Sequence, residues 1–304
     1  MYVDIAGIPQ WVQIEEGAPH SPIILLVHGG PGASTTFASE AWRSWRNHFT
    51  LVHWDQRGAG RTLAKNGEAL SKPMSFEQIV MDGIEVAEYL CKHLLVEKIL
   101  LLGHSWGSAV AVNMVMRRPE LFAAFVGTGM LVNFAENEKY NYRSLLSKAM
   151  STGNEEARLA LAEIGPPPYT DMAHLSVLRE WSDKLIEGKG DALYPSVMPP
   201  ADFSPEDREN IGKGFMFSAQ QLFGDLCRVD LSSLGFEFKV PMFCLMGTHD
   251  QQTSFELAER YFEQIEAPYK EVVGFEGCHH FVHMNCPEAF LDKLIHNVVP
   301  RLIY

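Results

Sequence analysis

The chain of 304 residues lacks several features that mark other classes of protein. No apolar run approaches the roughly 20 residues that a membrane-spanning helix needs, and the stretch from Met1 to Gly7 lacks the basic region and apolar core of a signal peptide. There are no internal repeats and no low-complexity tracts. We therefore expect no membrane span and a cytoplasmic location.

Positive charge and cysteine are both scarce. The chain has 25 Lys and Arg against 38 Asp and Glu, a net charge of −13, which argues against nucleic acid or an anionic membrane as the main partner. The five cysteines are odd in number and have no C-x-x-C spacing, so we expect reduced thiols. They are Cys91, Cys227, Cys244, Cys278 and Cys286.

Short continuous apolar runs alternate with helical patterns in the first half of the chain. The runs are Ile23 to Val27, Phe49 to Trp54, Ile99 to Leu102 and Phe122 to Val126. Strands of this kind, separated by helices, predict an α/β fold with a mostly parallel, doubly wound sheet. A hairpin is expected around Gly7-Ile-Pro9, and Ser75-Phe-Glu-Gln78 predicts a capping box that begins a long helix.

The pattern changes between residues 131 and 236, where proline-rich breaks separate helical stretches. We expect a helical cap (lid) inserted here, with residues 1–130 and 237–304 forming the core. The helical stretches are Glu138 to Met150, Glu155 to Glu163, Met172 to Glu187 and Phe215 to Leu226. The breaks are Pro166-Pro-Pro168, Pro195, Pro199-Pro200 and Pro205. Strand–helix alternation then resumes with Val240 to Met246, Ser254 to Ile265, Lys270 to Phe275 and Pro287 to Val299.

The segment Gly103-His-Ser-Trp-Gly107 lies between an apolar run and a helical stretch. This G-x-S-x-G pattern in a strand–turn–helix context is typical of a nucleophile elbow, which exposes a serine hydroxyl at the end of a central strand. Glycines on both sides remove Cβ atoms that would collide where strand and helix approach. Ser105 is the predicted nucleophile.

A serine hydroxyl needs a base, and the base needs an acid that orients it. Asp250 follows the strand that ends near Met246, which is where the acid is expected. The last strand is followed by three histidines, His279, His280 and His283. His279 and His283 are four residues apart, but no acidic ligand cluster or HExxH pattern accompanies them, so we expect no metal.

The glycine-rich segment His28-Gly-Gly-Pro-Gly32 follows another apolar strand. Such a loop can point backbone N–H groups at the nucleophile, so the amides of Gly30 and Trp106 are the predicted oxyanion donors. The loop matches neither GxGxxG nor GxxxxGK[ST]. We expect no cofactor.

Three motifs in order resemble the proline iminopeptidase (prolyl aminopeptidase) family of α/β-hydrolases. They are His28-Gly-Gly-Pro-Gly32, Asp55-Gln-Arg-Gly-Ala-Gly-Arg61 and Gly103-His-Ser-Trp-Gly-Ser108. The resemblance covers nearly all of the core and implies an α/β-hydrolase fold. It also selects the base: the family's histidine lies seven residues before a proline, which identifies His280 in His280-Phe-Val-His-Met-Asn-Cys-Pro287, with His279 as the runner-up.

The cap departs from the family pattern. Family members that remove amino-terminal proline use cap glutamates to hold the free amine, but Phe217-Ser-Ala-Gln-Gln-Leu-Phe223 has no carboxylate. We expect Glu136, Phe217 and Gln220 to contact substrate. The other cap acids that could replace the missing one are Glu138, Glu163 and Asp225, and the aromatic residues that could line a pocket are Phe134, Tyr140, Trp181, Phe215, Phe217 and Phe223.

The predicted function is a serine hydrolase that works through an acyl-enzyme on a small molecule or short peptide. The resemblance implies an aminopeptidase that releases small amino-terminal residues, proline first. A hydrolase of carboxylic esters, lipids or lactones is the alternative within this fold. A ligand-binding receptor with a hydrolase fold is the alternative from another class. The oligomeric state is not predicted.

Overall fold

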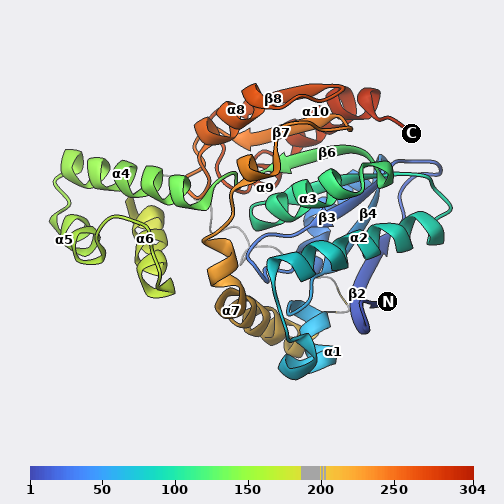
Figure 1. Cartoon of the computed structure of the whole chain (residues 1–304), viewed down its shortest axis with the longest axis horizontal. Coiled ribbons are helices and arrows are strands. Elements are labelled where there is room, and N and C mark those ends of the chain that lie inside the picture. The colour runs from blue at the N-terminus through green and yellow to red at the C-terminus, as the bar shows by residue number, and fades with distance from the viewer. Residues whose placement is uncertain (186–198, 200, 202) are drawn as a thin grey trace.

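The structure, a computed structural model, describes residues 1–185, 199, 201 and 203–304. Its centre is an eight-stranded sheet in the order β1-β2-β4-β3-β5-β6-β7-β8 (Figure 1). The first two strands pair antiparallel and the other six run parallel. The strands are β1 (Tyr2–Ile5), β2 (Ile8–Glu15), β3 (Ile23–Val27), β4 (Thr50–Asp55), β5 (Ile99–His104), β6 (Phe122–Thr128), β7 (Met242–Gly247) and β8 (Lys270–Phe275).

The continuous apolar runs are explained by burial on both faces of the sheet. Side chains alternate along a strand, and in β3 the residues Ile23, Leu25 and Val27 enter one hydrophobic cluster while Ile24 and Leu26 enter the other. Because both faces of such a strand are covered, its sequence is apolar at every position rather than alternately apolar and polar. The predicted α/β fold with a mostly parallel sheet is confirmed.

Helices cover both faces of the sheet. One face packs against α2 (Phe76–His93), α3 (Trp106–Arg117) and α8 (Phe255–Gln264). The other packs against a 3₁₀ segment, η1 (Thr36–Asn47), and the carboxyl-terminal helices. These are α9 (Val282–Asn285), α10 (Pro287–Lys293), the π-helical turn η5 (Leu294–Val298) and the short 3₁₀ turn η6 (Val299–Arg301). No described helix is long and apolar enough to span a membrane.

Among the described residues, four α-helices lie between β6 and β7, as the fold prediction requires. They are α4 (Phe134–Thr152), α5 (Glu155–Ile164), α6 (Met172–Leu185) and α7 (Pro205–Leu226). The first three extend to one side of the sheet around a small hydrophobic cluster of their own, whereas α7 lies beside α1 (Gly60–Ser71) (Figure 1). We use "cap" for α4–α7.

Several local predictions differ from the structure. Pro205 does not break α7 but begins it, because Ser204 caps the helix and proline is tolerated in the first turn. Only half of the predicted capping box forms at α2: Ser75 accepts from the Gln78 amide, but the Gln78 side chain bonds to Asp82 instead. The predicted end of a helix at Glu187 and the breaks at Pro195 and Pro200 lie outside the described residues.

Candidate active site

Ser105 occupies a strained turn between β5 and α3. Its φ of +54° and ψ of −124° lie in a region that side chains other than glycine rarely adopt. The turn is held by its amide, which donates to the Thr128 carbonyl at 3.0 Å, and by its carbonyl, which accepts from the Ser108 amide at 2.9 Å. The backbone thereby holds the serine side chain at the end of the strand.

The flanking glycines are required by close approach. A Cβ at Gly107 would lie 2.1 Å from the Val27 carbonyl oxygen, and a Cβ at Gly103 would lie 2.6 Å from the Gly107 carbonyl oxygen. Both distances are below any real Cβ contact. The G-x-S-x-G spacing therefore follows from how tightly α3 packs on β3 and β5.

His280 and Asp250 are in contact, and both are buried. His280 Nδ1 lies 2.8 Å from Asp250 Oδ2. The other carboxylate oxygen accepts from the amides of Gln252 and Thr253, each at 2.8 Å. The runner-up His279 is half-buried, and its ring lies near His249, with 6.1 Å between centroids. Of the two histidines, His280 is the one that contacts the predicted acid.

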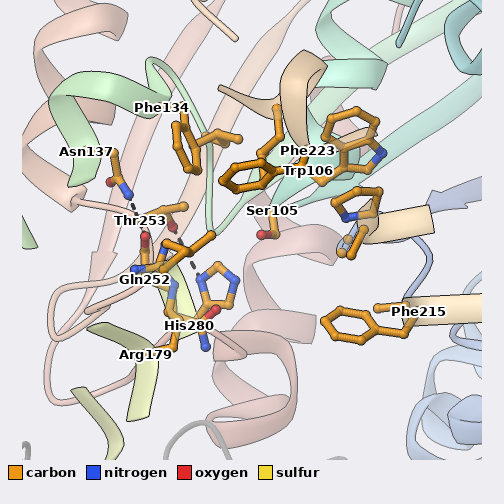
Figure 2. Close-up of a pocket in the computed structure, with 18 of the residues that line it drawn as sticks. Ser105, Trp106, Phe134, Asn137, Arg179, Phe215, Phe223, Gln252, Thr253 and His280 are labelled. Atoms are coloured by element: carbon orange, nitrogen blue, oxygen red, sulfur yellow. Dashed lines mark hydrogen bonds between the residues drawn. The ribbon is translucent and has the colours of Figure 1, made fainter. Parts of the chain in front are cut away.

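The three predicted triad residues lie at the same edge of the sheet, because parallel strands end there. Ser105 follows β5, Asp250 follows β7 and His280 follows β8. Ser105, Trp106 and His280 line one cavity of about 520 Å³ (Figure 2). Gly30 lines the same cavity. The nucleophile, base and oxyanion-donor positions predicted from sequence therefore share a single pocket.

The loop that carries Gly30 is linked to the elbow through Gln56. The Gln56 side chain donates to the His28 carbonyl at 2.9 Å and accepts from the Trp106 indole at 3.3 Å. Gly30 has φ +115°, which favours glycine. Trp106 is the first residue of α3, where an amide has no intrahelical acceptor. Both residues line the pocket that Ser105 also lines.

Asp55 and Arg57 anchor the loops behind this pocket. Asp55 accepts from the Ser34 hydroxyl at 2.5 Å and from the Arg61 amide at 2.7 Å. Burial raises the pKa of Asp55 to about 6, although these hydrogen bonds oppose the rise. Arg57 pairs with Asp82, with 2.8 Å between Nε and Oδ2, and both side chains are buried.

Several histidines around His280 are held neutral by burial. Burial lowers the pKa of His28 to about 4 and that of His283 to about 3. Burial, reinforced by the charge that His280 can carry, lowers the pKa of His104 well below its usual value. The His104 ring lies 4.7 Å from that of His280, so a charge on His104 would oppose protonation of the base. The neutral rings of His28, His104 and His283 therefore add no positive charge to this part of the site.

The cap contributes an ion pair to the pocket. Glu138 on α4 is 1% exposed and receives two hydrogen bonds from Arg179 on α6, at 2.9 and 2.5 Å. Asp183, one turn further along α6, also lines the pocket. Figure 2 shows Arg179 on the side where Gln252 and His280 lie, with Phe215 across the pocket.

The structure does not bring the three predicted cap residues into this pocket. Glu136 is exposed and pairs with Lys139 on the outer side of α4. Phe217 is buried beneath Lys72, and Gln220 is exposed. All three residues lie on α4 or α7, and both helices do contribute other side chains to the pocket. Because a helix turns by about 100° per residue, however, adjacent residues face different directions.

The remaining cap candidates divide in the same way. Phe134, Phe215 and Phe223 line the pocket. Tyr140 instead bonds to Glu256, and Trp181 packs inside the cluster of α4–α6. Glu163 is exposed, and Asp225 accepts from the Phe76 amide at 2.8 Å. The pocket's other apolar lining residues from the segment between β6 and β7 are Leu131, Met172, Leu175, Met216, Ala219 and Leu226.

A family model described as alpha/beta hydrolase family matches residues 24–293, which is most of the chain. The chain belongs to the alpha/beta hydrolase family. This hydrolase is 27% identical over 301 residues to the probable aminopeptidase YbaC of Bacillus subtilis (strain 168), a match that covers 96% of this chain and 93% of that protein. It is 22% identical over 305 residues to the proline iminopeptidase of Lactobacillus helveticus (strain DPC 4571), covering 95% and 93%.

Solved structures show the same fold in proteins with different names. A proline iminopeptidase-related protein from Thermus thermophilus superposes with a TM-score of 0.64 at 22% identity, covering 99% of this hydrolase and 97% of that chain. A thermophilic esterase from Thermogutta terrifontis gives a TM-score of 0.61 at 18% identity, covering 100% and 99%. The fold is therefore shared by peptidase-related and esterase proteins.

Sequence reasoning missed residues that hold the hydrolase's site together. Thr253 donates to Asp250 Oδ2 at 2.8 Å, and its hydroxyl lies 3.3 Å from His280 Nδ1. A Cβ at Gly129 would lie 2.8 Å from His280 Cε1, so that position must stay glycine. For both Gly129 and Thr253, the signal available in the sequence was their place in a segment that follows a strand.

The expectation that all five cysteines are reduced is wrong. Cys278 and Cys286 form a disulfide across the loop that carries His280, while Cys91, Cys227 and Cys244 are free. The short helix α9 lies between these two cysteines and reverses the direction of the chain, so that their Cα atoms are 6.5 Å apart, within the range that a disulfide requires. An eight-residue separation matches no common spacing pattern, so the sequence alone did not indicate this pair.

Proposed function

We propose that this chain is a serine hydrolase that works through an acyl-enzyme, and that it acts as an aminopeptidase on small amino-terminal residues, proline first. The contact between Asp250 and His280, in a pocket shared with the elbow residue Ser105, carries the proposal. The similarity to proteins named aminopeptidase and proline iminopeptidase supports the choice of substrate.

In the proposed mechanism, His280 removes the proton of the Ser105 hydroxyl as the oxygen attacks the substrate carbonyl. Asp250 holds the imidazole in position and stabilises its charged form. The amides of Gly30 and Trp106 donate to the oxyanion of the tetrahedral intermediate. His280 then gives its proton to the leaving amine, and a water molecule that it activates next hydrolyses the acyl-enzyme.

Glu138 is the cap carboxylate best suited to hold a substrate ammonium. It lines the pocket, and the guanidinium of Arg179 stabilises the carboxylate in this buried position. A carboxylate offers about four acceptor sites. The contacts with Arg179 and Asn137 use three of these, which leaves one for the ammonium. Asp183 adds a second negative charge at the same pocket.

Ester hydrolysis is the second candidate, and the apolar wall of the pocket favours it. Phe134, Phe215 and Phe223 offer a surface that an acyl chain can cover without any charged partner. The likeness to an esterase structure fits this interpretation. The two candidates share one catalytic mechanism and differ in whether a free amine is needed.

A substrate panel separates these candidates. The hydrolysis of prolyl-naphthylamide, of its N-acetylated form and of short p-nitrophenyl esters is measured for the wild type and for Ser105→Ala. The proposal expects hydrolysis of the free-amine substrate, little of the acetylated one, and none by Ser105→Ala, which also loses labelling by a fluorophosphonate. Activity on esters alone, without any need for an amine, would refute the peptidase proposal. Undiminished labelling of Ser105→Ala would refute the serine mechanism.

A further inference from the structure

The buried side-chain amide of Asn137, on the first cap helix, hydrogen-bonds to the loop that carries Asp250. Asn137 on α4 is 2% exposed, and its Nδ2 donates to the Gln252 carbonyl at 2.6 Å. Its Oδ1 accepts from the Ser254 amide at 2.8 Å. We propose that Asn137 is a positioning residue that sets the Asp250–His280 geometry from the cap. The inference rests on the serine mechanism proposed above.

The loop held by Asn137 is the one that orients the Asp250 carboxylate. Asp250 Oδ1 accepts from the amides of Gln252 and Thr253, and Oδ2 accepts from the Thr253 hydroxyl, all at 2.8 Å. Asn137 bonds to the residues on either side of Thr253. A shift of this segment would therefore move three of the hydrogen-bond donors that direct Asp250 toward His280.

The same amide also contacts the cap carboxylate. An asparagine amide nitrogen has two hydrogens. Asn137 Nδ2 lies within hydrogen-bond distance of Glu138 Oε1, at 3.1 Å, as well as of the Gln252 carbonyl. One side chain thus joins the pocket's ion pair to the triad loop. Through this amide, a substrate group bound at Glu138 acts on the position of Asp250.

No other side chain of this length supplies the same set of bonds. Aspartate at position 137 keeps the shape and the acceptor but sets a carboxylate against the Gln252 carbonyl and Glu138. Alanine removes both donors and the acceptor and leaves the Ser254 amide without its partner. The two substitutions therefore break the link in different ways, and neither removes a group that touches the reacting atoms.

Asn141 offers a matched control one turn along α4. It also donates to the Gln252 carbonyl, at 3.1 Å, and it is equally buried. Within the part of the chain that the structure describes, however, its side chain bonds to neither Ser254 nor Glu138. If the hydrogen bonds to both Gln252 and Ser254 are what position the loop, Asn141→Ala should lower the labelling rate constant less than either substitution at Asn137.

The test measures Ser105 reactivity without relying on a chosen substrate. The full-length wild type, Asn137→Ala, Asn137→Asp and Asn141→Ala are labelled with a fluorophosphonate, and both the rate constant and the final labelled fraction are recorded. Displacing a catalytic group by about 1 Å can cost about 100-fold in rate. We expect a 10- to 100-fold lower rate constant for both Asn137 variants, with the final labelled fraction unchanged. With an active substrate, kcat should fall more than KM rises.

The outcomes separate this inference from the function on which it rests. A wild-type protein that is not labelled contradicts the serine mechanism itself. If the wild type is labelled and both Asn137 variants are labelled with the wild-type rate constant, the positioning role alone is overturned. A reduced labelled fraction at an unchanged rate constant means that Asn137 serves only folding, which also overturns it. Asn137→Asp, being nearly isosteric, gives an answer if Asn137→Ala does not fold.

Discussion

The core and the cap contribute to one pocket in different ways. The core supplies Ser105, Asp250 and His280 from segments that directly follow strands of one sheet. The cap supplies Glu138 and Arg179 from two helices that pack around a separate small cluster. Under the proposed mechanism, the core governs whether a bond is broken, whereas the cap governs which molecule is presented.

The two regions also differ in how firmly their polar groups are held. Asp250 accepts four hydrogen bonds and is 3% exposed. In the cap pair, Glu138 is buried but Arg179 is 27% exposed. A substitution of Asp250 should therefore affect all substrates, and one of Glu138 should affect some of them.

The largest expected effect lies in the core, at the base. His280→Ala should lower kcat by about 10⁶-fold for every substrate, because loss of the base or nucleophile from a triad costs about that much. His279→Ala is the matched control, since His279 does not line the pocket, and it should keep nearly full activity. Steady-state kinetics measure both. A large loss in His279→Ala with little change in His280→Ala would reverse the assignment.

The next effect should be selective and should lie in the cap. Glu138→Gln should lower kcat/KM for free-amine substrates by about 10- to 100-fold, because a hydrogen bond to a charged group contributes about 1.5–3 kcal/mol. Ester substrates should change little. Glu136→Gln on the outer side of α4 serves as the control. Equal losses on amine and ester substrates would mean that Glu138 supports the fold of the pocket and does not bind the amine.

Acid should destabilise the core through its buried histidines. Burial lowers the pKa of His28 to about 4 and the pKa values of His53 and His283 to about 3. An unfolded histidine binds a proton near pH 6.5, so the unfolded state holds more protons below that pH, and stability falls as the pH drops. Each histidine should cost about 2 kcal/mol between pH 6.5 and pH 5.

Asp55 opposes this trend but does not cancel it. Burial raises its pKa to about 6, so the folded state gains a proton below that pH and is stabilised by about 1 kcal/mol at pH 5. Urea unfolding of wild type and His53→Gln at pH 7, 6 and 5 isolates one histidine. The variant should show the shallower decline in free energy of unfolding. Identical pH slopes for the two proteins would exclude a buried neutral His53.

The smallest effect should come from a contact between core and cap. Arg61 of α1 pairs with Asp207 of α7 at 2.9 Å, and this pairing lowers the pKa of Asp207 to about 2. Because solvent screens the partly exposed pair, Asp207→Asn should lower the free energy of unfolding by about 1 kcal/mol at neutral pH. The depressed pKa means that this contribution disappears as the pH falls from about 4 toward 2.

Glu209→Gln is the control for that measurement. Glu209 lies on the same helix and pairs only on the surface, with Lys213. Urea unfolding at low and high salt should show a larger, salt-sensitive loss for Asp207→Asn. Equal losses in both variants would mean that the contact between α1 and α7 does not hold the cap to the core.

Much of the core could be predicted because its signals are local. A strand buried on both faces must be apolar throughout, and β3 begins and ends at the residues expected of it. The elbow needs glycine at two close contacts, which fixes the spacing around Ser105. Asp250 could be proposed from its position after a strand end, whereas His280 was chosen among three histidines by the family resemblance. Helix starts were less reliable, as the half-formed capping box of α2 and the start of α7 at Pro205 illustrate.

The sequence by itself determined the fold class and the glycine spacing of the elbow around Ser105, because burial and steric crowding act on neighbouring positions. Only the tertiary structure decided that Glu138, and not Glu136, enters the pocket, and that Asn137 joins α4 to the loop after β7. It also decided that Cys278 meets Cys286. These contacts depend on how helices rotate and on which distant segments meet, and apolar periodicity in one sequence does not specify either.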